Sequence, residues 1–202
     1  PIIFSKQVDS TKITIGMQYV NNYSEEIISF INNIKTPEGG THITGFHIAL
    51  TRALKNYIDK NKIKVKANIE GEDTREGLII IISLLMQNPE FEGQTKEKLG
   101  NQEVKSIVDS FLYANLSTYF EENPNEMTKI IAKVSSAAEA RQSAKRARDL
   151  LRKKSIFEGS ILHGKLSDCT EKDPDKSELF IVEGESAAGS SKQGRDRLYQ
   201  AI

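Results

Sequence analysis

The chain has 202 residues, of which 38% are hydrophobic and 28% charged, a balance typical of a globular, soluble protein with enough apolar side chains for a core. Lysine plus arginine and aspartate plus glutamate both number 28, so the net charge indicates no particular class of partner. The single cysteine, Cys169, excludes an internal disulfide and a multi-cysteine zinc site, and it favours a reducing compartment.

The first part of the chain predicts two strands and a helix. Ile13–Tyr19 alternates apolar and polar residues as a half-buried strand does. Glu25–Asn32 predicts a second strand, paired with the first through the intervening turn. Pro37–Gly40 breaks the pattern, and Thr41 is then expected to cap a helix that ends near Asp59–Asn61.

Two more strands are predicted before the middle of the chain. Ile63–Ile69 alternates apolar side chains with lysine and asparagine, which predicts a strand with one solvated face. Leu78–Met86 is apolar at almost every position, which predicts a central strand covered on both faces. This run is too short to span a bilayer, and we expect no signal peptide at the start of the sequence.

Two helices are predicted next. Val104–Tyr119 has an amphipathic pattern that ends before Asn123 and Pro124. A long helix follows from about Glu126 to about Lys154, and its first half carries an apolar stripe. At helical spacing this stripe continues into four cations: Arg141, Lys145, Arg148 and Arg152.

Charge is distributed unevenly along the chain, in the second half of this helix and in the segment after it. Lys133–Lys154 holds eight basic and two acidic residues, whereas Asp168–Glu185 holds seven acidic and two basic residues. Four cations on one helix face favour binding to a polyanion such as DNA, or to a partner's acidic groove. A solvated helix face and pairing with the acidic run Asp168–Glu185 are the alternatives.

The segment Phe91–Asn101 is the first candidate site. Gly93 allows unusual backbone conformations, and Gln94, Thr95 and Lys96 then place an amide, a hydroxyl and an ammonium side by side. Such a loop can donate hydrogen bonds to an oxyanion, with a full positive charge from Lys96. The alternative is a solvated connector between a strand and a helix.

A second candidate lies near the C-terminal end of the sequence. Leu179–Val182 predicts a short buried strand that ends at Glu183 and is followed by Gly184 and a helix start. A carboxylate at such a strand end is a frequent catalytic or metal-binding group in α/β sheets, and an acidic helix cap is the alternative. Glu183 alone cannot hold a divalent ion well, because Mg²⁺ needs several oxygen ligands.

Other chemistries are excluded by spacing. The chain contains no P-loop and no G-x-G-x-x-G fingerprint. A hydrolase nucleophile elbow at Ser186 fails because Ala188 stands where the second glycine is needed. His42 and His47 are five residues apart on the predicted helix, a spacing that does not favour a shared metal ion.

Five segments, in this order and spacing, resemble the ATPase subunits of bacterial-type type IIA DNA topoisomerases, namely the DNA gyrase B family or its close relative, the E-type protein of topoisomerase IV. They are GGTHITGFHIALTRALKNY (Gly39–Tyr57), GEDTREGL (Gly71–Leu78), FEGQTKEKLGN (Phe91–Asn101), ILHGKLSDC (Ile161–Cys169) and ELFIVEGESAAGSSKQGRDR (Glu178–Arg197).

The resemblance implies a fragment of a larger α/β (α+β) protein. Residues 1–155 would form a transducer domain, with a mixed sheet, a βαβ crossover and a long exit helix. Residues 156–177 would be a linker, and residues 178–202 the start of a truncated toprim domain. An ATPase domain of the GHKL type would precede this part of the chain.

The resemblance also implies the sites and partners. Gln94 and Lys96 match the loop that contacts the γ-phosphate of ATP. Glu183 matches the toprim glutamate that binds Mg²⁺ and assists DNA strand cleavage, with further carboxylates expected beyond Ile202. The intact subunit would be an ATP-hydrolysing topoisomerase that couples ATP to DNA-gate opening and strand passage, whereas the isolated fragment would be inactive.

The implied partners are double-stranded DNA and a gyrase A-type subunit that carries the nucleophilic tyrosine. The gyrase B-type protein would also self-associate through its ATPase domain, which makes a heterotetramer. The location would be the cytoplasm, at the nucleoid, with a plastid as the alternative. From the charge pattern, we expect Arg141, Lys145, Arg148 and Arg152 to face the transported DNA segment.

Three departures and one rival reading accompany the resemblance. Glu185 and Ala188 replace the family's usual aspartate and glycine, which puts drug response in question, and His163 replaces the usual proline. The rival is a non-enzymatic nucleic-acid clamp whose only function resides in the basic helix.

Overall fold

The protein is described by a computed structural model over residues 1–8, 10–159 and 166–202, with residues 153–159 described by their backbone alone. It divides into two compact units, Pro1–Ser143 and Ala144–Ile202. The predicted division at residues 155 and 177 remains a prediction. No helix in the described part is long and apolar enough to cross a membrane.

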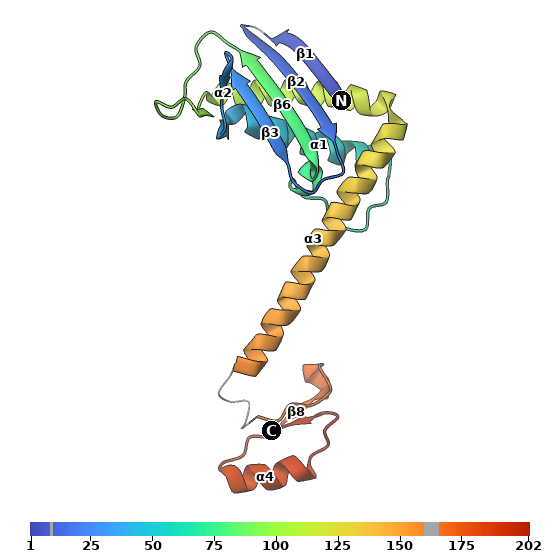
Figure 1. The fold of residues 1–202 in the computed structure, drawn as a ribbon. Coiled ribbons are helices and arrows are strands. Elements are labelled where there is room, and N and C mark those ends of the chain that lie inside the picture. The colour runs from blue at the N-terminus through green and yellow to red at the C-terminus, as the bar shows by residue number, and fades with distance from the viewer. Residues whose placement is uncertain (9, 160–165) are drawn as a thin grey trace. The chain divides into compact units, whose positions relative to one another are not determined.

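The first unit is built on a five-stranded mixed sheet in the order β1-β2-β6-β3-β4 (Figure 1). Every neighbouring pair is antiparallel except β3 and β6, which run parallel. The helix α1 lies between these two strands in the sequence, which confirms the predicted βαβ crossover. The strands are β1 (Ile2–Val8), β2 (Thr11–Tyr19), β3 (Glu26–Ile31), β4 (Ile34–Lys35) and β6 (Leu78–Leu85).

Two helices, α1 (Thr41–Lys60) and α2 (Gln102–Glu122), form the second layer behind the sheet (Figure 1). Alternate side chains of β2 and β6 meet the apolar faces of these helices in one core. The helices approach closely at Gly45, where a Cβ atom would lie 2.5 Å from the carbonyl oxygen of Lys105. The largest buried side chains include Phe46, Leu50, Leu54, Phe120, Ile13, Ile15, Ile80 and Ile82.

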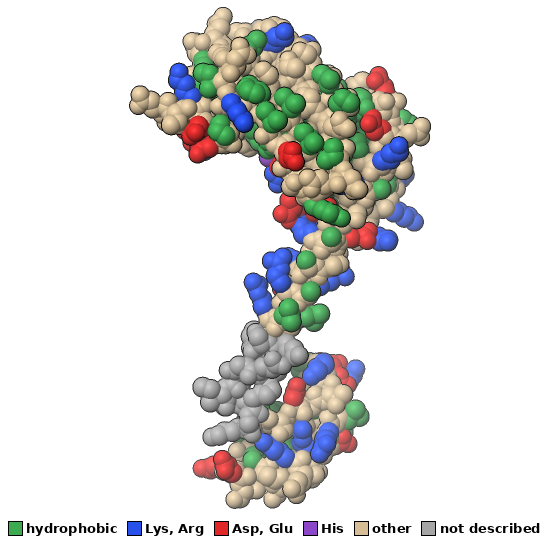
Figure 2. All heavy atoms as spheres, in the orientation of Figure 1, with side chains coloured by type: hydrophobic (Ala, Val, Ile, Leu, Met, Phe, Trp, Pro, Cys, Tyr) green, Lys and Arg blue, Asp and Glu red, His purple; other side chains and the backbone are tan. Residues whose placement is uncertain are grey.

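The predicted cover on both faces of β6 is wrong. The strand is central, but its burial alternates, and Ile81 and Leu85 are 49% and 42% exposed. The reason is that α1 and α2 both cover the same face, so hydrophobic side chains appear on the opposite face (Figures 1 and 2). An apolar run at every position therefore indicated a buried face correctly but not the number of layers.

The predicted pairing of the first two strands is also wrong. β2 pairs with β1 and β6, and β3 lies on the other side of β6. The strand β1 was not predicted, and β1 and β6 are the two neighbours of β2 in place of β3.

Two local predictions fail for physical reasons. Residues 63–69 form no strand, although Ala67 and Ile69 are buried while Lys64 and Lys66 are exposed. The alternation there reflects the burial of every second side chain in a segment that pairs with no strand of a sheet. Thr41 does not cap α1, because Gly40 is the N-cap residue and no side chain caps the helix.

The helix α3 (Pro124–Gly159) confirms the predicted long helix. In the second unit, β8 (Glu178–Leu179) and β9 (Gln200–Ala201) pair in parallel, and α4 (Glu185–Gly194) lies between them in the sequence. The predicted buried strand at residues 179–182 is wrong, since Ile181 is 91% exposed. Its partner strand β9 offers only two paired residues, so the ladder stops at once.

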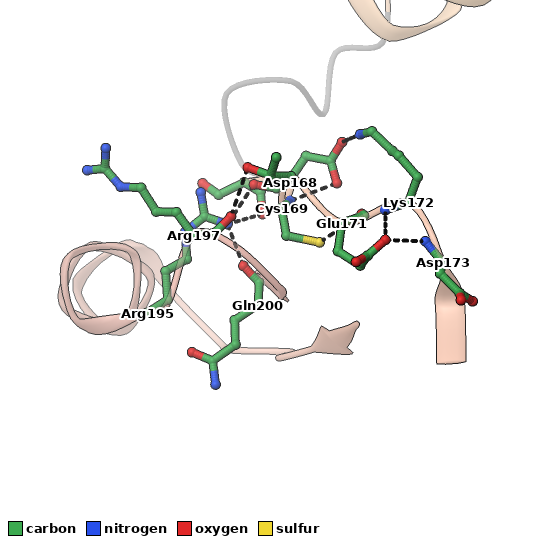
Figure 3. Close-up of polar contacts among 10 residues, drawn as sticks. Asp168, Cys169, Glu171, Lys172, Asp173, Arg195, Arg197 and Gln200 are labelled. Atoms are coloured by element: carbon green, nitrogen blue, oxygen red, sulfur yellow. Dashed lines mark hydrogen bonds and ion pairs between the residues drawn. The ribbon is translucent and has the colours of Figure 1, made fainter. Parts of the chain in front are cut away.

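Polar contacts hold the second unit together (Figure 3). Arg195 donates from Nη1 to the carbonyl oxygens of Ser167 and Gln200, at 2.8 and 2.7 Å. In the acidic run, Asp168 pairs with Lys172 at 3.2 Å, and this hydrogen bond lowers the pKa of the carboxyl. Acidic side chains of this run thus pair with lysines of the same run. The region around His163 lies outside the described residues.

Candidate functional site

The segment Phe91–Leu99 folds as a hairpin. Phe91 and Leu99 form an antiparallel bridge, and the amide of Glu92 donates to the carbonyl oxygen of Lys98 at 2.9 Å. The side chains of Glu92 and Lys98 form an ion pair at 2.8 Å across the base, and this hydrogen bond raises the pKa of Lys98. Asn101 closes the base further, because its Oδ1 accepts from the amide of Glu90 at 2.7 Å.

The base of this hairpin is bonded to the start of α1. Within the hairpin, β7 (Lys98–Leu99) pairs in parallel with β5 (Gly39–Gly40), which leads directly into α1. Gly40 has a φ of +133°, and a Cβ atom there would lie only 2.3 Å from the carbonyl oxygen of Leu99. Only glycine fits this contact. Two of the segments that resemble the family are therefore joined in space.

The tip of the hairpin is exposed. Gly93 and Lys96 adopt positive φ angles of +91° and +59°, which turn the chain at the tip. The side chains of Gln94, Thr95 and Lys96 are exposed. Lys96 makes no ion pair with any residue that the structure describes, in contrast to Lys98. The tip thus carries an amide, a hydroxyl and an ammonium side by side on an exposed surface.

This set of hydrogen-bond donors suits the terminal phosphate of a nucleotide, but it offers no contact to the base or the ribose. Charge-assisted hydrogen bonds from a lysine and an amide suit phosphate oxygens. The exposed tip encloses neither a base nor a ribose, so other segments would have to form the rest of a nucleotide pocket.

Glu183 lies between β8 and α4, immediately before Gly184, the N-cap residue of α4. Its side chain is exposed. Among the described residues, no group of three or more histidine, cysteine, aspartate or glutamate side chains could hold a metal ion. The described residues therefore form no complete Mg²⁺ site, and Glu183 could supply only part of one.

The four predicted DNA contacts on α3 divide into one enclosed and three exposed side chains. Arg141 donates from Nε and Nη2 to the two carboxylate oxygens of Asp73, at 2.9 and 3.0 Å. From Ser143 to Arg152 every residue of α3 is exposed, which includes the other three cations. Figure 2 shows basic side chains gathered along this part of the helix. Arg141 is therefore paired with carboxylates of the loop at residues 70–73, a contact that the sequence did not predict.

Asp73 is the residue that sequence reasoning missed. Its side chain is 2% exposed, and Glu70 and Glu72 lie beside it in the sequence. The segment GEDTREGL was recognised for its resemblance, but three acidic residues in four positions also indicated a partner of opposite charge. That partner is 68 residues away and could not be found from spacing.

Fold and site together define a two-layer α/β domain that presents an exposed hairpin, with an amide, a hydroxyl and an ammonium at its tip, and that continues into a long basic helix. The family model described as DNA gyrase B matches residues 2–150. The chain belongs to the DNA gyrase B family.

Known proteins agree with this assignment. The DNA gyrase B protein of Cytophaga hutchinsonii is 50% identical over all of this chain, which spans 43% of that protein. The 43K ATPase domain of Thermus thermophilus gyrase B, solved with an aminocoumarin, is 33% identical with a TM-score of 0.68, over 74% of this chain and 40% of that one. A topoisomerase IV ATP-binding domain of Francisella tularensis is 32% identical with a TM-score of 0.65, over 70% of this chain and 39% of that one.

The chain thus spans less than half the length of the curated relatives it matches, so most of each relative lies outside it.

Proposed function

We propose that this chain is the coupling part of a gyrase B-type subunit, in which ATP binding and hydrolysis drive DNA strand passage and change supercoiling. The observation that carries the proposal is that Lys96 has no ion pair among the described residues and lies on an exposed hairpin whose base is bonded to the start of α1. Family membership adds the ATPase and topoisomerase context, since the matched structures are ATPase and ATP-binding domains.

The proposed mechanism begins at the hairpin tip. ATP, held by an ATPase domain outside this chain, would supply a terminal phosphate with high negative charge. Gln94 donates a hydrogen bond to this phosphate, and the Lys96 ammonium stabilises the charge that develops on it during hydrolysis. After hydrolysis the phosphate leaves, and the tip loses its anionic partner. The β5–β7 pairing connects this change to α1.

The other sites complete the proposal. We assign Lys145, Arg148 and Arg152 to contacts with the DNA backbone, since these cations lie on the exposed part of α3. Arg141 is better explained as a structural residue, because carboxylates surround its guanidinium. Glu183 would be one ligand of a Mg²⁺ site completed by residues outside this chain.

The proposed partners are DNA, a gyrase A-type subunit with the nucleophilic tyrosine, and a second copy of the gyrase B-type protein. The proposed location is the cytoplasm, where the chromosome of a bacterial relative lies.

The test is a topology assay with the full-length protein and its A-type partner. We expect an ATP-dependent change in the linking number of closed circular DNA, and no ATP hydrolysis or DNA cleavage by the 202-residue chain alone. The rival clamp predicts DNA binding that ATP analogues leave unchanged and no change in linking number. That result with an active A-type partner would overturn the proposal.

A further inference from the structure

The loop formed by residues 70–77, here called the acidic loop, lies between α1 and α3. On the α1 side, Thr74 Oγ1 is 3.2 Å from Thr51 Oγ1, and Arg75 Nη1 donates to His47 Nδ1 at 3.2 Å. On the sheet side, the Tyr19 hydroxyl donates to the carbonyl oxygen of Thr74 at 2.6 Å. The acidic loop is therefore bonded to both layers of the first unit.

The ion pairs between the acidic loop and α3 involve the guanidinium of Arg141. Arg141 binds both carboxylate oxygens of Asp73, donates from Nη2 to the carbonyl oxygen of Asn68 at 2.8 Å, and pairs through Nη1 with Glu70 at 2.8 Å. The Asp73 side chain is 2% exposed, and its Oδ2 also accepts from the Glu70 amide at 2.7 Å. Such a planar, bidentate pair fixes orientation as well as distance.

Arg141 lies where α3 stops packing on the first unit. The preceding side chains Ala137 and Ala138 are buried, at 4% and 0% exposure, and from Ser143 to Arg152 the helix is exposed. The pair with Asp73 therefore holds the last packed turn of α3 before the exposed basic part begins.

A continuous set of contacts now runs from the hairpin to this point. The hairpin base is bonded to the start of α1 through Gly40 and Leu99, and α1 is bonded to the acidic loop through Thr51 and His47. The acidic loop is bonded to α3 through Arg141. Each step is a hydrogen bond or ion pair between neighbouring elements of the first unit.

We propose that the Asp73–Arg141 pair is the positioning contact through which the state of the Lys96 hairpin reaches α3. Both are positioning residues, since the proposed mechanism places neither against nucleotide or DNA. The inference rests on the proposed function: it identifies the joint by which nucleotide state is coupled to movement of the exit helix. A joint that has two arrangements is the physical requirement for such coupling.

The experiment uses the full-length protein assembled with the A-type partner, carrying Asp73→Asn or Arg141→Lys. Glu139→Gln is the matched control. Glu139 lies on α3, as Arg141 does, and its substitution removes an exposed ion pair with Lys66, at 3.9 Å. The readout is the linking-number change per ATP hydrolysed, measured beside the ATPase rate without DNA. We expect this ratio to fall about fivefold or more in both variants, with the ATPase rate without DNA retained and the control unchanged.

Three outcomes would overturn the inference or separate it from the proposed function. A normal ratio in variants that melt at lower temperature would make the pair a structural brace only. Equal loss of ratio in Glu139→Gln would show a general sensitivity of α3. No ATP-dependent topology change in the unmodified protein would refute the proposed function itself. If Asp73→Asn fails to fold, Arg141→Lys and the exposed-partner variant Glu70→Gln provide the same test.

Discussion

Two polar loops lie at the two ends of β6 and differ in what their side chains touch. The acidic loop precedes the strand and is bonded to α1, β2 and α3. The hairpin follows the strand, is bonded only at its base, and leaves Lys96 at the tip without an ion pair among the described residues.

The difference teaches where each loop's charge acts. The charge of a cation enclosed by carboxylates, such as Arg141, is compensated within the protein. The charge of an exposed lysine with no ion-pair partner is not compensated, so it remains available to bind an external anion. Composition did not separate the two loops, since both are polar and charged. The contacts separate them.

The largest stability effect is expected where the hairpin is bonded to α1. Gly40→Ala should lower the free energy of unfolding by about 3 kcal/mol or more, because the new Cβ would meet a backbone oxygen and the residue has a positive φ. Gly93→Ala is the control at the tip, where nothing lies within 4 Å, and should cost only about 1 kcal/mol of backbone strain. Urea unfolding of the chain measures both. Equal losses would mean that the base is no more constrained than the tip.

Removing the buried carboxylate should have the next largest effect. Asp73→Ala should lower the free energy of unfolding by about 2 kcal/mol, less than for a fully buried pair because Arg141 is 22% exposed. Lys96→Ala at the exposed tip should change it by less than about 0.5 kcal/mol. A comparable loss in Lys96→Ala, measured by the same unfolding, would contradict the contrast between the loops.

A smaller, pH-dependent effect is expected from His42, in the first turn of α1. Its ring is fully buried, neither nitrogen has a hydrogen-bond partner among the described residues, and burial lowers its pKa from 6.5 to about 4. Below pH 6.5 His42 binds a proton in the unfolded chain, whereas in the folded chain it does so only near pH 4. The free energy of unfolding therefore falls as the pH drops from 6.5 to about 4.

Between pH 7 and pH 5 the loss attributable to His42 should be about 1–2 kcal/mol. His42→Gln should remove that part of the pH dependence in urea unfolding measured at both pH values. An unchanged pH profile in the variant would assign the effect to another group.

Local patterns in the sequence predicted elements better than pairings. The apolar run of β6 and the spacing of Phe46, Leu50 and Leu54 in α1 reflect one buried face each, and burial is a local property of the chain. The partners of those faces are set by segments far away. β1 was missed for this reason, and so was the neighbour of β2.

The candidate site was predicted in part. The donors Gln94 and Lys96 were identified from side-chain chemistry and from the family resemblance, and the structure places them on an exposed tip. The enclosure of Arg141 was not predicted, because a contact across 68 residues leaves no trace in helical spacing. Cations in register with a buried stripe can serve an internal acid or an external one, and only packing distinguishes them.

The smallest effect per residue is expected from the exposed cations of α3. Replacing Lys145, Arg148 and Arg152 with glutamine in the full-length protein should weaken DNA-stimulated ATPase activity and spare the basal rate. The log–log salt dependence of DNA binding should become shallower by about 0.9 for each phosphate interaction removed. Arg146→Gln offers a control on the same exposed helix, at a position outside the stripe. If Arg146→Gln had the same effect per residue, DNA binding would depend on the overall positive charge of the helix and not on the face that carries the stripe.

The most direct measurement is the ATPase kinetics of Lys96→Ala beside Lys98→Ala in the full-length protein. Lys96 is unpaired at the tip among the described residues, whereas Lys98 is held by Glu92 at the base, two residues away. We predict that Lys96→Ala lowers kcat by about 100-fold while the Kd for nucleotide changes far less, and that Lys98→Ala retains most activity. An unchanged kcat with a raised KM in Lys96→Ala, or the same loss in both variants, would contradict a phosphate-sensing role for the hairpin.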